Sequence, residues 1–447
     1  MRRSTFLLIL ILCSAPIFGQ KTTTNYEALA RSITADLVAR RFDQVVAHFS
    51  PEIAKALDAP ALAAAWDSII GQYGAFGSIE RVEQEEKPGL QVIYLTTVFA
   101  RGELTLTLVF DSNGHVVSFT ATPPQARESW KPPEYAKADS FTERSVTITT
   151  GMWQLPGTLT IPSGPGPFPA VVLVHGSGPH DQDESIGPNM TFKDLAWGLA
   201  SRSVAVLRYE KRTHKYGAKS SADPATLTIA DETIDDARSA VALLTATQEI
   251  DPKRIYVLGH SLGGYIAPRI ATGNTKIAGL VLMAGNTRPV EDLVVEQIRN
   301  AVSLGDKVTP EGQKQIEAVE KEMGEWRSPD LKPGMTVHLL GAPVPASYVL
   351  DLRGYKPGDT AALLKIPILV LQGERDIQVR TADFEGWKKA LTGHANATFK
   401  LYPALNHLFM PGTGPSSGSE YQKPNHVSKE VIDDIAAWIV STTIKKK

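Results

Sequence analysis

The chain has 447 residues, of which 43% are hydrophobic, and its formal net charge at pH 7 is −2. A chain of this length and apolar content predicts two or three domains, each with a buried core. The near-zero charge gives no sign of nucleic acid or an anionic surface as a partner, because such partners select a strongly basic face.

The first 20 residues have the pattern of a secretory signal peptide. Two arginines follow Met1, an apolar run extends from Phe6 to Leu12, and smaller residues lead up to Gly19. This run is too short for a stable membrane span, and no other run is long and apolar enough to cross a bilayer. We therefore expect cleavage near Gly19 or Gln20 and a secreted or periplasmic protein.

Cys13 is the only cysteine, and it lies within this leader. A lipid anchor on Cys13 is the alternative, although Leu12 before it is bulkier than lipoprotein signals usually allow. Removal of the leader would leave a mature chain without a disulfide, a thiol nucleophile or a thiolate metal site.

Residues 25–122 have the pattern of a separate small α+β domain. Two helical stretches and then three strand-like runs are predicted at 26–49, 61–73, 91–99, 103–110 and 115–120. Asp111-Ser112-Asn113-Gly114 between the last two runs is a hairpin turn signal. Helices followed by antiparallel strands predict a sheet that helices cover on one face.

This domain resembles a domain of unknown function that precedes hydrolase domains in bacteria and is similar to the nuclear-transport-factor-like fold. The resemblance rests on the order of elements and on Trp66 followed by the segment 74–77. His48 and His115 are isolated, and we expect both to be structural. The prolines between 123 and 133 predict a semi-rigid linker over 123–139.

From residue 140 the pattern becomes that of an α/β domain, which we place at 140–443. An antiparallel pair of strands is predicted at 145–150 and 157–161. Further strands are predicted at 170–174, 204–207, 254–258, 279–283, 366–371 and 398–402, with helices at 192–201, 229–247 and 427–443. Strands this apolar, separated by helices, predict a mostly parallel, doubly wound sheet covered on both faces.

The regular alternation is interrupted between Gly285 and Leu364. Two helical stretches, 290–304 and 310–326, are inserted there between two sheet strands. An excursion of this length typically serves as a lid over a site. We therefore expect a helical cap at about 286–364, with apolar residues such as Leu293 and Ile298 lining a substrate pocket.

The segment Gly259-His260-Ser261-Leu262-Gly263 is a G-x-S-x-G pentapeptide between a predicted strand and a predicted helix. A serine on so sharp a turn has a strained backbone, and small neighbours let the strand and the helix pass closely. The helix N-terminus favours negative charge that develops beside it. The motif predicts that Ser261 is a nucleophile, and the alternative is a glycine turn with an inert serine.

A serine nucleophile needs a base, and the base needs an orienting carboxylate. In a doubly wound sheet such groups lie on loops at the carboxyl ends of strands, where this sequence has Asp376 and His407. The chain order Ser261, Asp376, His407 is that expected of α/β-hydrolases. Three alternatives remain, which are the carboxylate Glu374 and the bases His394 and His426.

The region from about 140 to 443 resembles the α/β-hydrolase family, in particular bacterial esterases similar to dienelactone hydrolases and to the catalytic domains of prolyl oligopeptidases. The matching segments are 175–178, 208–212, 259–264, 373–376 and 406–407. The family pattern implies Asp376 rather than Glu374 as the orienting carboxylate. The chain departs from that pattern at Glu210, where aspartate is usual, and at Thr213, where glycine is usual.

An oxyanion hole is expected beside Ser261. The amide of Leu262 should supply one donor, and the loop after Val174 the other, from Ser177 or alternatively from Gly178. His175 is expected to shape that loop. Two further groups of charged residues are expected to be a structural ion network (Arg208, Glu210, Arg212) and a solvated acidic cluster (Asp181, Asp183, Glu184). For the acidic cluster, binding of calcium or of a cationic substrate group is the alternative.

These features predict an exported serine carboxylesterase that acts on a small-molecule ester through an acyl-enzyme intermediate, with no cofactor or metal implied. A cap of modest size favours an ester over an extended peptide. One alternative is a serine exopeptidase or small oligopeptidase with the same triad. The other is a ligand-binding protein with a vestigial hydrolase fold. The sequence leaves the acyl and alcohol specificity and the oligomeric state open.

Overall fold

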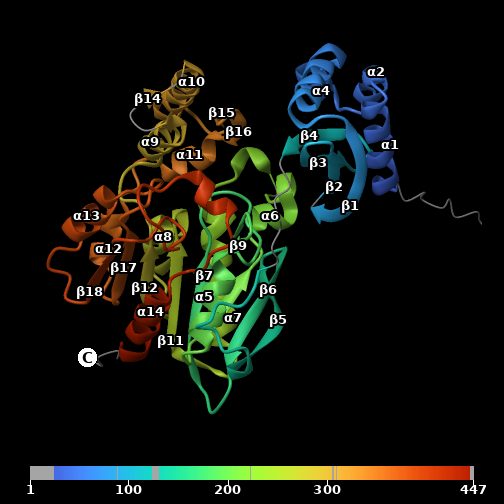
Figure 1. The fold of residues 1–447 in the computed structure, drawn as a ribbon. Coiled ribbons are helices and arrows are strands. Elements are labelled where there is room, and N and C mark those ends of the chain that lie inside the picture. The colour runs from blue at the N-terminus through green and yellow to red at the C-terminus, as the bar shows by residue number, and fades with distance from the viewer. Residues whose placement is uncertain are drawn as a thin grey trace, which may run out of the picture. The chain divides into compact units, whose positions relative to one another are not determined.

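The computed structural model describes residues 25–87, 89–122, 130–221, 223–304, 307–308 and 310–442. The chain divides into two compact units, residues 1–125 and 126–447, each with its own apolar core (Figure 1). The expected signal peptide and Cys13 lie outside the described residues.

The first unit consists of helices followed by an antiparallel sheet, as the sequence predicted. The helices are α1 (Tyr26–Val38), α2 (Phe42–Val46), α3 (Pro51–Ala56) and α4 (Ala59–Tyr73). The strands are β1 (Phe76–Lys87), β2 (Leu90–Phe99), β3 (Gly102–Asp111) and β4 (Val116–Thr122), which pair in that order. Side chains such as Leu37 and Trp66 from the helices share one core with Leu95 and Leu106 from the sheet.

Two details of this unit differ from the sequence prediction. The single helix expected over 26–49 is broken at Arg40, whose φ of 60° cannot continue a right-handed helix and whose guanidinium pairs with Asp67 at 2.6 Å. Strand β1 was not predicted, because its register against β2 shifts twice and its apolar residues therefore do not alternate.

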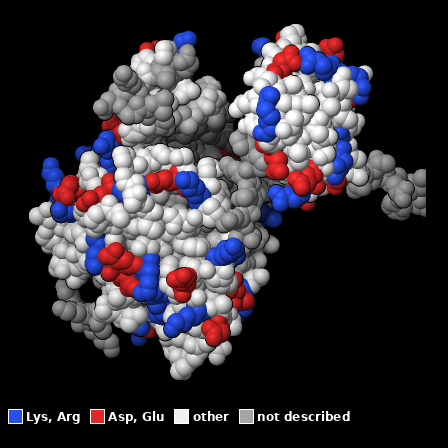
Figure 2. Space-filling view, in the orientation of Figure 1, with Lys and Arg blue, Asp and Glu red and all other residues white. Residues whose placement is uncertain are grey.

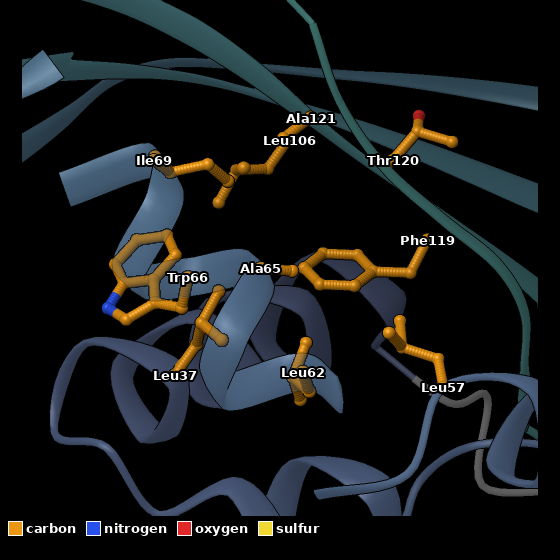
Figure 3. A pocket seen from close by; sticks show the side chains of 10 residues that line it. All are labelled: Leu37, Leu57, Leu62, Ala65, Trp66, Ile69, Leu106, Phe119, Thr120 and Ala121. Atoms are coloured by element: carbon orange, nitrogen blue, oxygen red, sulfur yellow. The ribbon is translucent and has the colours of Figure 1, made fainter. Parts of the chain in front are cut away.

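A small cavity of about 100 Å³ lies between α4 and the sheet of the first unit. Figure 3 shows that its lining is almost wholly apolar, with Trp66, Phe119 and Leu57 around it. Ligand pockets usually begin at roughly 300 Å³, so this space is a gap in packing rather than a site of drug-like size.

The second unit is built on an eight-stranded sheet with the strand order β18-β17-β12-β11-β7-β10-β6-β5. These strands are β5 (Phe141–Thr150), β6 (Trp153–Pro162), β7 (Phe168–Val174), β10 (Ala205–Tyr209), β11 (Ile250–His260), β12 (Ile277–Met283), β17 (Ile368–Gly373) and β18 (Ala397–Tyr402). All neighbours from β18 to β10 pair in parallel, and β6 and β5 are antiparallel. The predicted mostly parallel sheet is confirmed.

Helices cover both faces of this sheet (Figure 1). The helices α5 (Thr191–Ala200) and α14 (Lys429–Ser441) pack on one face. The helices α7 (Asp235–Thr245), α8 (Leu262–Ala271) and α13 (Thr381–Ala390) pack on the other. Along β7, Val171 and Leu173 enter the first core and Val172 the second, since successive side chains of a strand point to opposite faces.

Shorter elements connect these helices and strands. They are the two-residue strands β8 (Ser185–Ile186) and β9 (Asn189–Met190), helix α6 (Arg212–Tyr216), a π-helical turn at Ala230–Ile234 that leads into α7, and single 3-10 turns at Ala138–Ser140, Gly217–Lys219, Pro224–Thr226 and Gly418–Gln422.

Residues 284–367, called the insertion below, separate β12 from β17. They form α9 (Val290–Val302), β13 (Ser303–Leu304), β14 (Lys307–Val308), α10 (Pro310–Arg327), β15 (Thr336–Leu339), β16 (Ala342–Pro345), α11 (Ala346–Leu352) and α12 (Pro357–Leu363). The insertion has a small core that includes Met323, Trp326 and Val349. The sequence predicted its two long helices, whereas the four-residue strands are too short to show a periodicity.

The segment expected as a linker over 123–139 is only partly one. The Trp130 indole packs on Trp197 of α5 with ring centroids 5.0 Å apart, and its Nε1 donates to the buried Asp194 at 2.8 Å. The Tyr135 ring packs against the core that α5 and α14 form with the sheet, so the described end of this segment belongs to the second unit.

On the face drawn in Figure 2, acidic and basic side chains are interspersed over both units. This mixture agrees with the net charge of −2.

Candidate active site

Ser261 occupies a strained turn between β11 and α8. Its backbone has φ 53° and ψ −117°, a conformation that non-glycine residues rarely adopt. The turn is held in place because the Ser261 amide donates to the Met283 carbonyl at 2.8 Å and the Ser261 carbonyl accepts from Tyr265 at 3.0 Å. The strand and the helix thus meet at the serine, as the motif predicted.

The glycines of the motif are explained by close backbone contacts. A Cβ on Gly259 would lie 2.2 Å from the Gly263 carbonyl, and a Cβ on Gly263 would lie 2.2 Å from the Val174 carbonyl. Both separations are far below any tolerable contact, and the atoms are backbone that cannot move aside. Only glycine therefore lets β11, α8 and the end of β7 approach this closely.

The structure brings Asp376 and His407 into direct contact. Asp376 Oδ2 accepts from His407 Nδ1 at 2.7 Å, and both side chains are buried. The Asp376 carboxylate also accepts from the side-chain amide of Gln372 at 3.0 Å and from the backbone amides of Gln378 and Val379 at 2.8 and 2.9 Å. Glu374, the alternative carboxylate, is exposed.

The loop of His407 is fixed by its neighbour Asn406. Asn406 Oδ1 accepts from the amides of Leu408 and Met410, each at 3.1 Å, and Nδ2 donates to Glu420 at 3.1 Å. Glu420 in turn pairs with Arg375. A buried asparagine thus closes the turn that carries the histidine, which gives the Asn406-His407 pair of the sequence a physical role.

The alternative bases lie in other surroundings. His394 forms a hydrogen bond with the Leu364 carbonyl at 3.0 Å, and His426 pairs with Asp194 at 3.0 Å. Neither partner belongs to the turn of Ser261 or to the loop of His407. Both histidines are partly exposed.

The loop after β7 runs directly beside the serine. A Cβ on Gly176 would lie 3.2 Å from the Ser261 Cβ. Ser177, Gly178 and Leu262 line one cavity of about 370 Å³. Among the described residues no group accepts the Ser177 amide hydrogen, and Leu262 is the first residue of α8, whose amide has no partner within the helix. Two amides in such positions suit an oxyanion hole.

The insertion supplies most of the remaining cavity wall. Its apolar lining residues include Val290, Val294, Ile298, Trp326, Leu339, Val344 and Leu352. Three polar or charged side chains, Glu232, Gln297 and Tyr348, interrupt this apolar surface. Of the two residues expected to line a pocket, Ile298 lines this cavity, whereas Leu293 is buried and does not.

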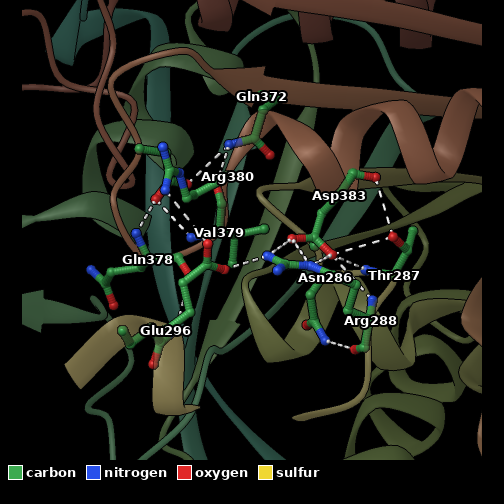
Figure 4. A network of polar contacts seen from close by, with 12 residues as sticks. Asn286, Thr287, Arg288, Glu296, Gln372, Gln378, Val379, Arg380 and Asp383 are labelled. Carbon is green, nitrogen blue, oxygen red and sulfur yellow. Dashed lines mark hydrogen bonds and ion pairs between the residues drawn. The ribbon is translucent and has the colours of Figure 1, made fainter. Parts of the chain in front are cut away.

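The start of the insertion is anchored to α13 by a buried carboxylate (Figure 4). Asp383 is wholly buried and accepts from the amides of Thr287 at 2.8 Å and Arg288 at 3.1 Å. The Arg288 guanidinium also binds Asp383 at 2.7 Å and Glu296 at 2.6 Å. Figure 4 shows this network close to Gln372 and Gln378, which hold Asp376.

The acidic cluster after the loop is only partly solvated, contrary to the sequence expectation, because Glu184 is buried while Asp181 and Asp183 are partly exposed. Glu184 is almost wholly buried, with Oε2 2.9 Å from His260 Nδ1 and Oε1 accepting from the Gly176 amide at 2.7 Å. Asp183 pairs with Arg208 at 2.6 Å. Asp181 accepts from the amides of Asp183 and Ser185. The positive φ of Glu184 (47°), which sequence periodicity does not reveal, accompanies this inward placement.

Burial and charge act against each other on these groups. Burial opposes ionisation of Glu184, but the charge of His260 beside it prevails and lowers the pKa of Glu184 to about 2. Burial would lower the pKa of His260, yet Glu184 raises it above the ordinary value. Burial lowers the pKa of His175 to about 3, so its ring is neutral, and its Nε2 forms a hydrogen bond with the Asp181 carbonyl. His175 therefore shapes the loop.

The expected ion network of three residues is instead three separate groups, because each of the three residues has its own partners. Arg208 binds Glu143 and Asp183, Arg212 binds Asp236, and Glu210 binds His214. Sequence reasoning assigned no role to the residue between them, Lys211. Its Nζ is buried, 2.9 Å from the Gly176 carbonyl and 3.2 Å from Glu232. The only signal in the sequence that could have pointed to Lys211 was its position inside the segment 208–212, which matches the family pattern.

Within the described part of the chain, no group of three or more histidine, cysteine, aspartate or glutamate side chains is placed to hold a metal ion. Within the same residues, no helix has both the length and the apolar character needed to cross a membrane.

The chain is similar to two protein families and to a known esterase. Residues 171–413 match the alpha/beta hydrolase family, and residues 30–119 match a family described as a protein of unknown function. The chain is 37% identical over 440 residues to the esterase EstD of Thermotoga maritima, an alignment that covers 98% of this chain and all of that protein. The predicted resemblance to esterases of this family is confirmed.

Solved structures with lower identity are also similar. One is Est1E from Butyrivibrio proteoclasticus, with 16% identity and a TM-score of 0.43, where the match covers 67% of this chain and 99% of that one. Another is an esterase from Pyrococcus furiosus, with 16% identity and a TM-score of 0.43, where the match covers 70% and 97% of the two chains.

Proposed function

The chain belongs to the α/β-hydrolase family and is an esterase, and on this premise we propose that it is a serine carboxylesterase with the triad Ser261, His407 and Asp376. The observation that carries the proposal is the buried hydrogen bond of 2.7 Å between His407 Nδ1 and Asp376 Oδ2. This bond leaves Nε2 of His407 as the nitrogen that can act as a base.

In the proposed reaction, Ser261 Oγ attacks the acyl carbonyl carbon while His407 Nε2 takes the hydroxyl proton. Asp376 stabilises the resulting imidazolium through the Nδ1 hydrogen bond. The tetrahedral oxyanion accepts hydrogen bonds from the amides of Leu262 and Ser177. Its collapse breaks the ester C–O bond, and His407 returns the proton to the departing alcohol. A water molecule, activated by the same histidine, then hydrolyses the acyl-enzyme.

The substrate class follows from the cavity. We propose that the insertion acts as a cap whose apolar residues, such as Val294 and Ile298, hold the acyl or alcohol part of a small-molecule ester. A volume of about 370 Å³ lies within the range of small-molecule pockets, and an apolar lining favours an uncharged substrate.

The test is substitution of the two groups that perform the chemistry. S261A and H407A should each lower kcat on nitrophenyl esters by roughly 10⁴-fold or more while the protein stays folded, because a triad fails as a unit. H115A, an exposed histidine of the first unit, is the control and should keep full activity. Esterase activity of S261A close to that of the unsubstituted protein would exclude the proposed nucleophile.

The two alternatives are separated by other measurements. Faster cleavage of amino-acyl nitroanilides than of nitrophenyl esters would indicate an exopeptidase. Failure of a fluorophosphonate to label Ser261, read by peptide mass spectrometry, would indicate a vestigial site. We expect ester preference and labelling.

We also propose that the protein is exported. The support is the charged and then apolar pattern of the first 20 residues. Mass spectrometry of protein from the periplasm or the medium should find an N-terminus near Gln20 or Lys21. A lipid-modified Cys13 at the N-terminus would contradict this and indicate a membrane anchor.

A further inference from the structure

Lys211 is a buried cation that the reaction described above does not use. Its side chain is 2% exposed, and its Nζ lies 2.9 Å from the Gly176 carbonyl oxygen and 3.2 Å from Glu232 Oε1. Burial of an ammonium group is unfavourable unless it is paired and hydrogen-bonded, and these two contacts meet that requirement. The contact with a backbone carbonyl of the loop beside Ser261 suggests a purpose beyond stability.

The contact fixes a particular peptide group. In a trans peptide the carbonyl of one residue and the amide hydrogen of the next point in opposite directions. Lys211 holds the carbonyl of Gly176, so the amide of Ser177 must point away from Lys211. The preceding peptide is also held, because the Gly176 amide donates to Glu184 at 2.7 Å. Gly176 is thus held by a buried anion on one side and a buried cation on the other.

The charge also acts on the strength of the donor. A cation at the carbonyl oxygen polarises the whole peptide group, which makes the opposite N–H a stronger hydrogen-bond donor. The next peptide group, Ser177–Gly178, is polarised less strongly. Its carbonyl, that of Ser177, contacts His180 Nε2 at 2.6 Å, and His180 is only partly buried.

We propose that Lys211 is a positioning residue of the oxyanion hole, which orients and polarises the Gly176–Ser177 peptide so that the amide of Ser177, rather than that of Gly178, receives the oxyanion. The inference rests on the proposed serine mechanism. Lys211 itself touches no reacting atom in this arrangement, and its effect passes through one peptide group.

The test compares two substitutions of Lys211 that have graded properties. K211M keeps the approximate volume but removes both donor and charge, whereas K211Q keeps a donor and removes the charge. Each kcat is divided by the number of sites that a fluorophosphonate titrates, so that unfolded protein does not count. We expect kcat to fall by about 10- to 100-fold in K211M, less in K211Q, with KM changed by less than about threefold, since full removal of one oxyanion donor costs roughly 10²- to 10³-fold.

A second measurement follows the oxyanion directly. An alkyl boronic acid forms a tetrahedral adduct with the serine and places an oxygen in the hole. Its Kd should rise in K211M by the same factor as kcat falls. R212M is the matched control, because Arg212 is the next residue, is equally buried and pairs with Asp236 rather than with Gly176. It should lower Tm but leave kcat per titrated site and the boronate Kd unchanged.

Several outcomes would overturn the inference. The first is a kcat per titrated site within twofold of the unsubstituted protein in both Lys211 variants. The second is a fall in kcat/KM that comes from KM alone. The third is a larger loss of kcat in H180N than in K211M, which would assign the donor to Gly178. If S261A itself retained esterase activity, the proposed mechanism would fail independently of Lys211. An inactive S261A with an unaffected K211M would overturn the inference about Lys211 alone.

Discussion

Glu184 Oε2 lies 2.9 Å from His260 Nδ1, and both side chains are almost wholly buried next to Ser261. The pair links three segments of the site. Glu184 holds the Gly176 amide, and His260 Nε2 donates to the backbone carbonyl of His407 at 3.0 Å. The rings of His260 and His407 are also in contact, with centroids 4.8 Å apart. A single ion pair therefore ties together the loop after β7, the turn of Ser261 and the loop of His407.

This pair predicts a pH window for stability. The pKa of Glu184 is lowered from 4.5 to about 2, so its contribution to folding is complete above pH 4.5 and is lost as the pH falls towards 2. The pKa of His260 is raised above 6.5, so its contribution is complete below pH 6.5 and is lost as the pH rises through the raised pKa. Both contributions are complete only between pH 4.5 and 6.5.

H260N should therefore destabilise the protein most within that window, by about 3–5 kcal/mol if the pair behaves as buried pairs usually do. The measurement is Tm as a function of pH for H260N and for the unsubstituted protein, and the difference between the two Tm values should narrow above pH 6.5. H115N, at an exposed pair with Asp111, should change Tm little at any pH. A Tm difference for H260N that is constant from pH 4.5 to 9 would contradict the assignment.

The orienting carboxylate gives a second prediction. D376N should lower kcat by roughly 10⁴-fold. The asparagine side chain keeps the geometry of the site, but its amide stabilises the wrong tautomer of His407. E374Q is the matched control two residues away, and its exposed side chain should tolerate the change with kcat unaltered. If E374Q loses more activity than D376N, the carboxylate has been assigned incorrectly. The measurement is kcat on a nitrophenyl acetate at the optimum pH of each protein.

The sequence predicted the sheet, the strained turn at Ser261 and the placement of Asp376 and His407 on loops after strands because these depend on local patterns. Apolar runs mark buried strands, and glycine is required at 259 and 263 because a Cβ at either position would lie 2.2 Å from backbone atoms of a neighbouring segment. The buried charges around the site were missed for a physical reason. Whether Glu184 or Lys211 faces solvent depends on tertiary contacts with Gly176, which no local periodicity encodes. Strand β1 was missed because register shifts remove its alternation.

The cavity wall predicts chain-length specificity. Ile298 on α9 lines the cavity, so I298A should create space and raise the ratio of kcat/KM for octanoate over acetate esters, by about tenfold if two methylene groups gain contacts. V295A is the control on the same helix, because Val295 packs against the core of the insertion and does not line the cavity. The same ratio in I298A as in V295A would show that α9 does not contact the substrate.

The last prediction concerns the boundary between the two units. A protein that lacks residues 1–125 retains the second unit with its sheet, its proposed triad and its insertion. It should hydrolyse small acetate esters with kcat/KM within about threefold of the full chain, since each unit has its own core.

A protein that lacks residues 1–135 also loses Trp130 and Tyr135, which pack on α5 and its core. Loss of Trp130 leaves the wholly buried Asp194 with one donor fewer. We expect the longer truncation to unfold at a lower Tm, because the lost aromatic burial alone lowers its free energy of unfolding by roughly 2 kcal/mol or more. Thermal melts and acetate-ester kinetics on both truncations make the comparison. Equal Tm values would show that residues 126–135 are only a linker. A folded protein without residues 1–125 that has lost acetate-ester activity would show that the first unit takes part in catalysis.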